Sequence, residues 1–196
     1  MSSSHKGERF DVDVLSQAEV ARLIETFNKR LFNGARNRAM VAVMYRAGLR
    51  VSELCDLRTS HLDLQVGLVR VQNGKGGKRR VAGIDTATAA YVQDWLQRRD
   101  AGSNWLFHTR TGKRVDPRHM RAMLKRYARR AGIDKRVHPH GLRHTHACEL
   151  AREGVPINVI QKQLGHSNVA VTSTYLNHIA ADEVVQTMQQ RDWTAA

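Results

Sequence analysis

The chain has 196 residues, and its 32 Lys and Arg residues against 18 Asp and Glu give a formal net charge of +14. With 41% hydrophobic residues, 14 Gly and 3 Pro, the composition is that of a globular protein and excludes a disordered or collagen-like chain. The apolar runs are too short for a membrane helix, and the start MSSSHKGERF lacks the apolar core of a signal peptide. We therefore expect a cytoplasmic protein with a polyanionic partner and no membrane partner.

The first third of the chain predicts helices with clear ends. Residues 1–14 are polar and predict a flexible tail. Ser16 and Glu19 have the spacing of a capping box, so a helix should begin there. A second helix is expected over residues 36–47, where apolar residues recur at helical spacing and Gly48 follows as a terminating glycine.

The hydrophobic pattern changes after a short third helix, which is expected over residues 51–57. Residues 67–72 and 78–84 are short β-type runs on either side of the turn-forming segment 73–77, and together they predict a β-hairpin with a basic tip. Helical patterns then return over residues 86–99, 118–131, 141–153, 157–164 and 172–177.

A last amphipathic segment, residues 181–190, is expected to dock on the body of the protein or on a neighbouring copy. The pattern as a whole predicts an α+β fold that is mostly α-helical, with a small antiparallel sheet formed around the hairpin. No internal repeat or low-complexity segment interrupts it.

Basic residues gather on the predicted hairpin and on the predicted helix that begins near residue 118. On the helix they recur at three- and four-residue spacing and therefore share one face. Two such clusters in a strongly basic chain predict contacts to the phosphates of a nucleic acid. The residues that we expect to bind DNA are Lys78, Arg79 and Arg80 on the hairpin, and Arg118, Arg121 and Lys125 on the helix.

The sequence gives no support for a metal site, an ATP site or a nucleophilic serine or cysteine. Histidines are frequent over residues 138–146, but Gly141 stands where a zinc protease motif needs a glutamate and no CxxC pair occurs, so we expect no metal. No phosphate loop and no G-x-S-x-G motif is present, so we expect no ATP site and no serine nucleophile. Cys55 and Cys148 lie far apart in amphipathic stretches, which predicts buried free thiols in a reducing compartment.

The remaining polar residues suit phosphoryl transfer on DNA. Arg50 and Arg143 stay charged throughout and can hold the non-bridging oxygens of a phosphodiester by paired hydrogen bonds. Tyr175 would act as a nucleophile once its charge is stabilised or a base such as His140 takes its proton. Lys75, at the tip of the predicted hairpin, would protonate the leaving 5′-oxygen.

At these positions the sequence resembles the tyrosine recombinase, or phage integrase, family. Residues 47–54 (AGLRVSEL) resemble its first arginine box, and residues 73–78 (NGKGGK) resemble its hairpin lysine. Residues 140–144 (HGLRH) resemble its H-x-x-R motif, and residues 164–166 (LGH) with Tyr175 resemble its final box. The resemblance runs from about Leu15 to about His178, in the family's order.

By this resemblance, six residues would surround the scissile phosphate: Arg50, Lys75, His140, Arg143, His166 and Tyr175. Tyr175 would form a 3′-phosphotyrosyl link to DNA, and Lys78 competes with Lys75 for the role of general acid. Glu53 would orient the site as a supporting carboxylate, and His144 would support it by hydrogen bonding. The resemblance implies neither a metal nor ATP, because the phosphotyrosine conserves the bond energy for rejoining.

The resemblance also predicts an organisation: a flexible tail over residues 1–14, a catalytic domain over residues 15–180, and a C-terminal helix or tail over residues 181–196 that docks in trans. Most family members carry a helical DNA-clamping domain before the catalytic one. We therefore expect either a catalytic-domain fragment or a small stand-alone recombinase similar to the fimbrial-switch inverting enzymes. Without a clamp, fewer phosphates are neutralised, which predicts weak and salt-sensitive binding to DNA.

Strand exchange between paired sites implies a homotetramer on double-stranded DNA and a monomer in solution, in a bacterial or phage-encoded protein associated with the nucleoid. Two alternatives stay open. A type IB topoisomerase would use the same chemistry without paired sites. A DNA-binding regulator or architectural protein would keep the fold without turnover, although binding alone has no use for Tyr175 or Lys75.

Overall fold

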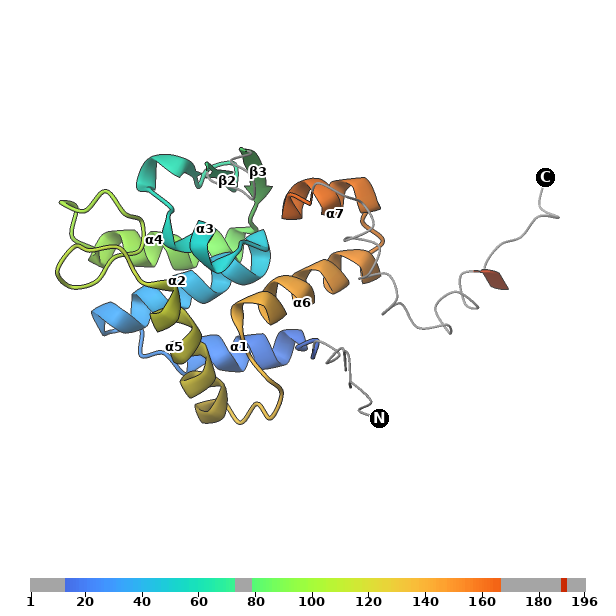
Figure 1. Cartoon of the computed structure of the whole chain (residues 1–196), viewed down its shortest axis with the longest axis horizontal. Helices are drawn as coiled ribbons and strands as arrows, with labels where there is room; N and C mark the ends of the chain where they lie inside the picture. Colours follow the sequence, from blue (N-terminus) through green and yellow to red (C-terminus); the bar gives the residue numbers. More distant parts are fainter. Residues whose placement is uncertain (1–12, 73–78, 167–187, 190–196) are drawn as a thin grey trace, which may run out of the picture.

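The computed structural model describes residues 13–72, 79–166 and 188–189 of the chain (Figure 1). Within these residues the helices are α1 (Gln17–Glu25), α2 (Phe32–Ala47), α3 (Val51–Cys55), α4 (Thr86–Arg98), α5 (Pro117–Arg130), α6 (Pro139–Arg152) and α7 (Ile157–Leu164). A 3-10 turn, η1 (Thr59–His61), leads into the strands β1 (Leu62–Asp63), β2 (Leu68–Val71) and β3 (Arg80–Gly83). The predicted fold class, mostly helical with a small antiparallel sheet, is confirmed.

Three helix ends, the start of α1 and the ends of α2 and α7, carry clear signals in the sequence. The predicted capping box is confirmed: the Ser16 N–H donates to Glu19 Oε2 at 2.7 Å, and the Glu19 N–H donates to Ser16 Oγ at 3.1 Å. Gly48 ends α2 in the left-handed conformation with φ 58°, and Gly165 ends α7 in the same way with φ 67°. Because L-residues with a side chain rarely adopt this conformation, glycine is the residue expected at both positions.

The start of α2 differs from the sequence prediction, which placed it at Arg36. The helix begins four residues earlier at Phe32, and its N-cap residue Leu31 makes no side-chain capping bond. Without a Ser, Asp or Asn at the cap, the sequence carried no signal for this end. Packing of Phe32 against Trp95, with ring centroids 4.9 Å apart, ties the extra turn to the core.

The sheet has three antiparallel strands in the order β1-β2-β3. Val69 pairs with Ala82, and Val71 pairs with Arg80. These four residues set the register of the predicted hairpin, whose two strands are confirmed, and the two valines and Ala82 are buried. The hairpin tip, residues 73–78, lies outside the described residues. The short strand β1 was not predicted, because a two-residue strand is too short to show an alternating pattern.

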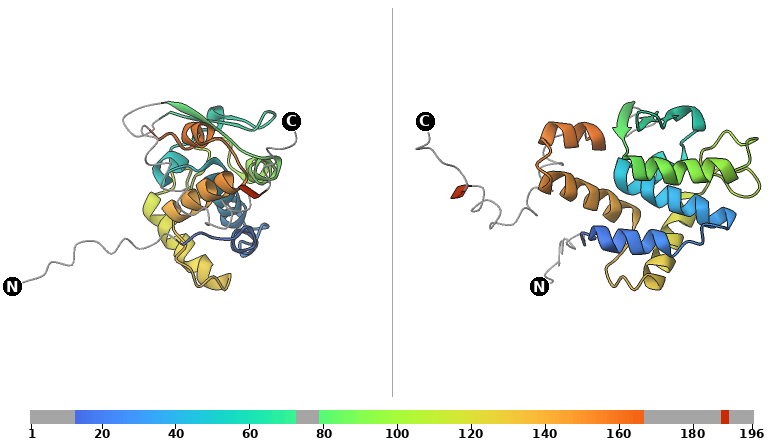
Figure 2. Two further views of the ribbon diagram at one scale, coloured as in Figure 1. Left: turned by 90° about the vertical axis from the view of Figure 1, so that its right-hand side faces the viewer. Right: turned by 180° about the vertical axis from the view of Figure 1, so that it is seen from behind.

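Helix α2 forms the centre of the described part of the chain. It packs against α4, α6 and α1, and Figures 1 and 2 show it running between α4 and α1 with α6 alongside. Its residues from Ala39 to Met44 are at most 2% exposed, so the helix is buried around nearly its whole circumference. Each fully buried aliphatic side chain contributes about 1.5–3 kcal/mol, so this helix anchors the core.

Helix α7 packs on one side against α6 and on the other against β3. Figure 1 shows it next to the sheet and above the far end of α6. This contact brings the C-terminal end of α7 towards the strand that begins at Arg80. Of the predicted segments 172–177 and 181–190, only Met188 and Gln189 lie in the described residues.

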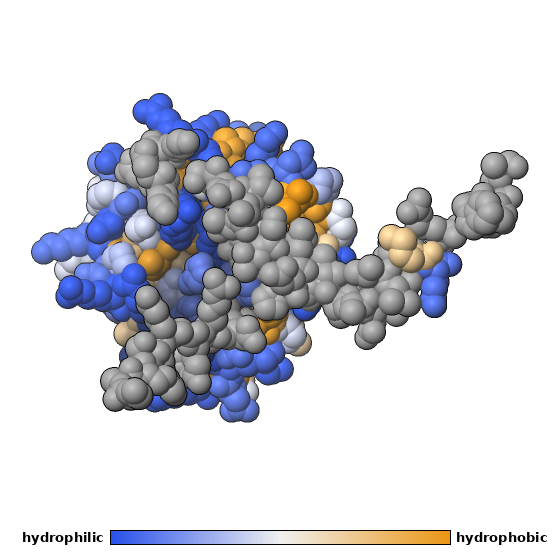
Figure 3. Space-filling view, turned by 45° about the vertical axis from the view of Figure 1, so that its right-hand side comes forward, coloured by the Kyte–Doolittle hydropathy of each residue, from blue (hydrophilic) through white to orange (hydrophobic). Residues whose placement is uncertain are grey.

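The described surface is dominated by polar side chains. In Figure 3 the coloured surface is mainly hydrophilic, with small hydrophobic areas. The large apolar residues that are more than half exposed, Leu31, Val66, Val81 and Met188, lie far apart in the sequence. None of the described helices has the length and apolar character that crossing a bilayer requires.

Candidate active site

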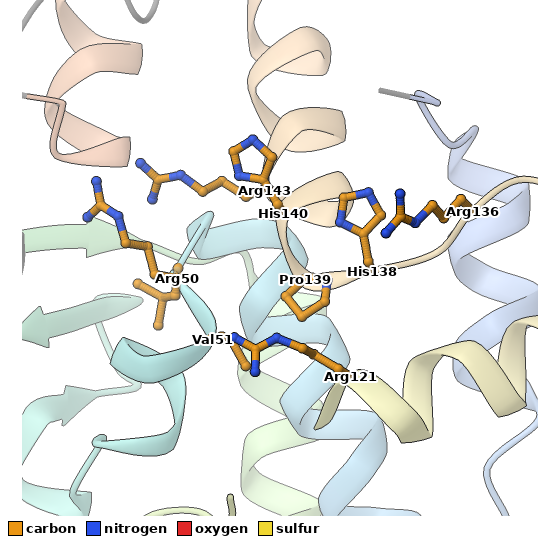
Figure 4. A pocket seen from close by; sticks show the side chains of 9 residues that line it. Arg50, Val51, Arg121, Arg136, His138, Pro139, His140 and Arg143 are labelled. Carbon is orange, nitrogen blue, oxygen red and sulfur yellow. The ribbon is translucent and has the colours of Figure 1, made fainter. Parts of the chain in front are cut away.

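A pocket of about 340 Å³ opens where the N-terminal ends of α3 and α6 approach each other. Figure 4 shows that the side chains of Arg50, His140 and Arg143 come together on one side of it, while Arg121, Arg136 and His138 lie nearer the other side. Three of the predicted catalytic residues, which are up to 93 positions apart in the chain, therefore line one pocket. The remaining lining residues are Leu49, Val51 and Pro139.

Arg50 is the N-cap residue of α3, and Glu53 holds it in two ways. The Arg50 backbone N–H donates to Glu53 Oε2 at 2.8 Å, and Arg50 Nη1 donates to Glu53 Oε1 at 2.8 Å. Glu53 is only 4% exposed. Burial alone would raise the pKa of Glu53, but hydrogen bonds from Arg80 and from the Arg50 backbone outweigh it and hold the pKa below its usual value. The carboxylate is therefore charged at neutral pH and orients Arg50.

Arg143 is buried, with 2% of its surface exposed, and main-chain carbonyls hold it. Its Nη1 donates to the Gly48 oxygen at 2.5 Å, and its Nη2 donates to the Leu164 oxygen at 2.7 Å. These carbonyls stand at the C-terminal ends of α2 and α7, where helix dipoles concentrate partial negative charge. Arg143 thus joins the ends of two helices, and its position depends on the packing of α6 against both.

Gly48 also leaves room for this arrangement. A Cβ atom built on it would lie 2.6 Å from Leu164 Cδ2 and 2.9 Å from His146 Cδ2, closer than real Cβ contacts. A side chain here would force Leu164 and His146 to shift and would also be strained by the positive φ, so glycine is the residue that fits best. The close approach of α2, α6 and α7 around Gly48 brings its carbonyl within reach of Arg143.

Two predicted catalytic histidines lie in the positive field of the arginines. His140 is the second residue of α6, and burial followed by Arg143 and Arg50 lowers its pKa below the usual value. Burial, with further contributions from Arg143, Arg50, Arg80 and His140, lowers the pKa of His166 to about 4. Both imidazoles are therefore neutral at pH 7, and a neutral imidazole can accept a proton.

His138 caps the helix that carries the second arginine. As N-cap of α6 it accepts a hydrogen bond on Nδ1 from the Gly141 N–H at 3.2 Å, and Pro139 occupies the first helical position. Its ring stacks near that of His140, with centroids 6.4 Å apart. This cap fixes the direction in which α6 presents His140 and Arg143.

Comparison with known proteins decides the family. The sequence model of the phage integrase family matches residues 13–182, which is most of the chain. The chain belongs to the phage integrase family.

Several curated proteins are similar to this member of the phage integrase family. A tyrosine recombinase of Thermosipho africanus is 39% identical over 172 residues, covering 87% of this chain and 59% of that protein. Tyrosine recombinase XerA of Thermococcus kodakarensis is 40% identical over 164 residues, covering 82% of this chain and 56% of that protein. The chain thus spans somewhat more than half the length of these relatives.

Solved structures of the family share the fold. The crystal structure of XerA recombinase superposes with a TM-score of 0.79 at 33% identity, covering 92% of this chain and 66% of that one. The XerH site-specific recombinase, bound to a palindromic difH substrate, gives a TM-score of 0.73 at 21% identity, covering 90% of this chain and 52% of that one. The second similarity extends to the fold alone.

The residues predicted to bind DNA fall into two groups in this phage integrase fold. Arg79 on the hairpin is exposed, as are the three residues predicted on α5: Arg118, Arg121 and Lys125. Arg80 differs, because its side chain is 10% exposed and both of its terminal nitrogens donate to Glu53. It is therefore packed inside the site rather than placed on the surface of the hairpin.

Sequence reasoning did not single out Arg136, which lines the pocket together with His138 and Arg121. Its side chain makes no ion pair to a carboxylate in the described ranges, and neither does that of Arg121. The available signal was its position four residues before His140, in the loop that leads into α6.

Some predicted residues do not join the pocket or lie outside the described residues. His144 is buried on α6, where its Nε2 lies 3.7 Å from Cys148 Sγ one helical turn away. Lys75, Lys78 and Tyr175 lie outside the described residues, so their predicted roles stay predictions.

The predicted free thiols are confirmed, since Cys55 and Cys148 are both buried and unpaired. Burial raises their pKa to about 12 and about 11, so both stay protonated at neutral pH and are poor nucleophiles. Residues 13–72 and 79–166 contain no group of three or more His, Cys, Asp or Glu that could hold a metal ion.

Proposed function

We propose that this chain is the catalytic part of a site-specific DNA recombinase or integrase, which cleaves and rejoins DNA strands through a 3′-phosphotyrosyl intermediate. The observation that carries the proposal is the convergence of Arg50, His140 and Arg143 on one pocket in a member of the phage integrase family. The names of its relatives agree, since those at 39% and 40% identity are called tyrosine recombinases.

The two arginines provide electrostatic stabilisation of the transition state. Charge develops on the non-bridging oxygens as the phosphodiester is attacked, and Arg50 and Arg143 supply N–H donors that their own partners already hold in place. Donors that need no reorganisation during the reaction are the most effective ones. Removing one such donor typically slows a reaction by about 10²- to 10³-fold.

The covalent step requires residues that are assigned from the sequence. The Tyr175 oxygen attacks phosphorus, a bond from that oxygen to phosphorus forms, and the bond from phosphorus to the 5′-oxygen breaks. His140, neutral at pH 7, takes the tyrosine proton, and Lys75 gives a proton to the leaving 5′-oxygen. Rejoining is the reverse reaction with a 5′-hydroxyl, so the phosphotyrosyl bond conserves the energy and no ATP is consumed.

The proposed partner is double-stranded DNA, held by phosphate contacts. Arg121 of α5 and Arg136 line the same pocket as the arginine pair, and Arg118 and Lys125 of α5 are exposed, so these positive charges are available to contact DNA phosphates. Recombination of two sites requires a homotetramer on paired DNA, and we propose a monomer in solution, in a cytoplasmic, nucleoid-associated protein of a bacterium or phage. The proposed organisation is a tail over residues 1–14, a catalytic domain over residues 15–180 and a segment over residues 181–196 that docks in trans.

The test is covalent capture of DNA. The chain is incubated with nicked suicide duplexes whose core sequence is randomised, and adducts that survive denaturation are isolated and sequenced. The wild-type chain should form an adduct, Tyr175→Phe should form none, and Arg143→Lys should form it at least about 100-fold more slowly. Sequenced adducts would also define the preferred core.

The outcomes separate the proposal from its rivals. Binding without an adduct, even after a clamping domain from a relative is added, would favour a DNA-binding regulator. Relaxation of supercoiled plasmids that carry no selected core would favour a topoisomerase. Both results would overturn the recombinase assignment.

A further inference from the structure

Arg80 occupies an unusual place for a residue of a basic hairpin. It begins β3, five residues after Lys75 in the chain, yet only 10% of its side chain is exposed and its bonds reach two other elements. Nη1 and Nη2 donate to the two oxygens of Glu53, both at 2.8 Å, in a bidentate pair. Nε donates to the Gln163 carbonyl of α7 at 3.3 Å. One side chain thus links β3 to α3 and to α7.

The C-terminal end of α7 packs closely against the Arg80 side chain. A Cβ built on Gly165 would overlap the Arg80 side chain, lying 2.7 Å from Nε and still closer to Cδ. Gly165 follows the last residue of α7 and precedes His166. The positive charge of Arg80 also contributes to lowering the pKa of His166. Arg80 therefore lies directly beneath the turn that carries a predicted catalytic histidine.

The bond to Glu53 has a consequence for Arg50. Among the residues that the structure describes, the Arg50 side chain bonds to Glu53 alone, through Nη1. Arg80 pairs its positive charge with this carboxylate and donates to both of its oxygens. Without Arg80, only the Arg50 backbone N–H and Arg50 Nη1 would hold the carboxylate, which could then turn towards the Arg50 guanidinium and accept a second donor from it. A second bond of this kind would withdraw a donor from the pocket.

We propose that Arg80 is a positioning residue for the cleavage reaction, which fixes Glu53 so that Arg50 faces the scissile phosphate and which ties the hairpin strand to the turn before His166. The proposal rests on the proposed strand-cleavage function. In the proposed role, Arg80 itself touches no substrate. Its effect reaches the phosphate through Glu53 and Arg50, because their bonds form a continuous chain of charged groups.

The first test needs no cleavage activity. In the 15N-labelled 196-residue chain, the Nε–Hε signal of Arg50 is assigned by its loss in Arg50→Lys. Arg80→Met should shift or broaden this signal, whereas Arg98→Met should leave it unchanged. Arg98 is a suitable control because it forms an ion pair with Asp94 on α4 with 40% of its side chain exposed. An Arg50 signal that is identical in Arg80→Met and wild type would overturn the proposal.

The second test separates positioning from general support of the fold. At saturating DNA, Arg80→Met should form the covalent adduct about 10- to 100-fold more slowly, while DNA affinity changes less than about threefold. In a Glu53→Gln background, Arg80→Met should slow adduct formation by no more than about twofold, because Arg80 acts through that carboxylate. If Arg80→Met slowed adduct formation equally in the two backgrounds, Arg80 would not act through Glu53. If it lowered DNA affinity alone, Arg80 would not be a positioning residue.

Two further measurements keep the result interpretable. If Arg80→Met unfolds, Arg80→Lys retains the charge but loses the bidentate pair, and it should show the same Arg50 shift with a smaller rate loss. If the wild-type chain binds DNA but forms no adduct, the proposed function fails, and the Arg50 signal still decides whether Arg80 positions Arg50.

Discussion

Protonation of the buried His146 should contribute to the destabilisation of this fold by acid. His146 lies on α6 with 3% of its surface exposed, and its Nδ1 has no hydrogen-bond partner among the described residues. Burial, reinforced by Arg46 and Arg143 and opposed by Asp85, lowers its pKa from 6.5 to about 4. Protonating this ring in the folded chain would place an additional positive charge in the interior, between α2, α6 and α7.

Proton linkage gives the direction and the size of the change in folding stability with pH. The unfolded chain binds a proton at His146 below about pH 6.5 and the folded chain only below about pH 4, so stability is full above pH 6.5 and is lost as the pH falls towards 4. At pH 5.0, about 1.5 units below the unfolded value, the folded ring is still mostly neutral. One pKa unit corresponds to about 1.4 kcal/mol, so His146 should lower the free energy of unfolding by about 2 kcal/mol at pH 5.0 relative to pH 7.5.

The assay is urea unfolding followed by circular dichroism at both pH values, for wild type and His146→Gln. The glutamine cannot take up a proton, so the variant should lose about 2 kcal/mol less on acidification than the wild type does. His119→Gln, which removes an exposed histidine of α5, should change the pH dependence far less. Identical pH dependence in wild type and His146→Gln would refute the reasoning.

Two further predictions follow from glycine geometry and from surface charge. Gly154→Ala should lower the free energy of unfolding by about 1 kcal/mol, because Gly154 has a positive φ and open space around it. Gly165→Ala should lower it by more, because Gly165 has a positive φ and also abuts Arg80. Equal losses measured by calorimetry would contradict this. Arg121→Gln and Arg136→Gln should each reduce the slope of log affinity for duplex DNA against log salt by about one, and a slope unchanged from that of wild type would exclude a phosphate contact.

The sequence predicted local features better than distant contacts. The capping box at Ser16, the stop at Gly48 and the two strands of the hairpin depend on residues within a few positions of each other, so the pattern was sufficient. The start of α2 and the strand β1 were missed because neither carries a local signal. The chemistry of Arg50, His140 and Arg143 was read from residue types, and the structure brings these three residues to one pocket.

Arg80 illustrates what the pattern could not reveal. Its neighbours in the chain are basic and belong to a turn-rich segment, so a surface role was the natural interpretation. The partner that determines its position, Glu53, is 27 residues away, and the two meet only in the folded chain, where β3 packs against α7 and the Arg80 side chain reaches α3. Charge counted along a sequence gives the sign of a surface, but it does not distinguish a cation in solvent from one that is paired inside the fold.

The residue types also do not reveal which hydrogen-bond acceptors hold Arg143. They are main-chain carbonyls, present at every position, and within a helix only those of the last turn lack a helical partner. Gly48 and Gly165 end α2 and α7 where these carbonyls face α6, so the two glycines terminate their helices and also help to hold Arg143, a predicted catalytic residue. A signal that predicts where a helix stops therefore also predicts where a buried cation can be held, once the packing of the helices is known.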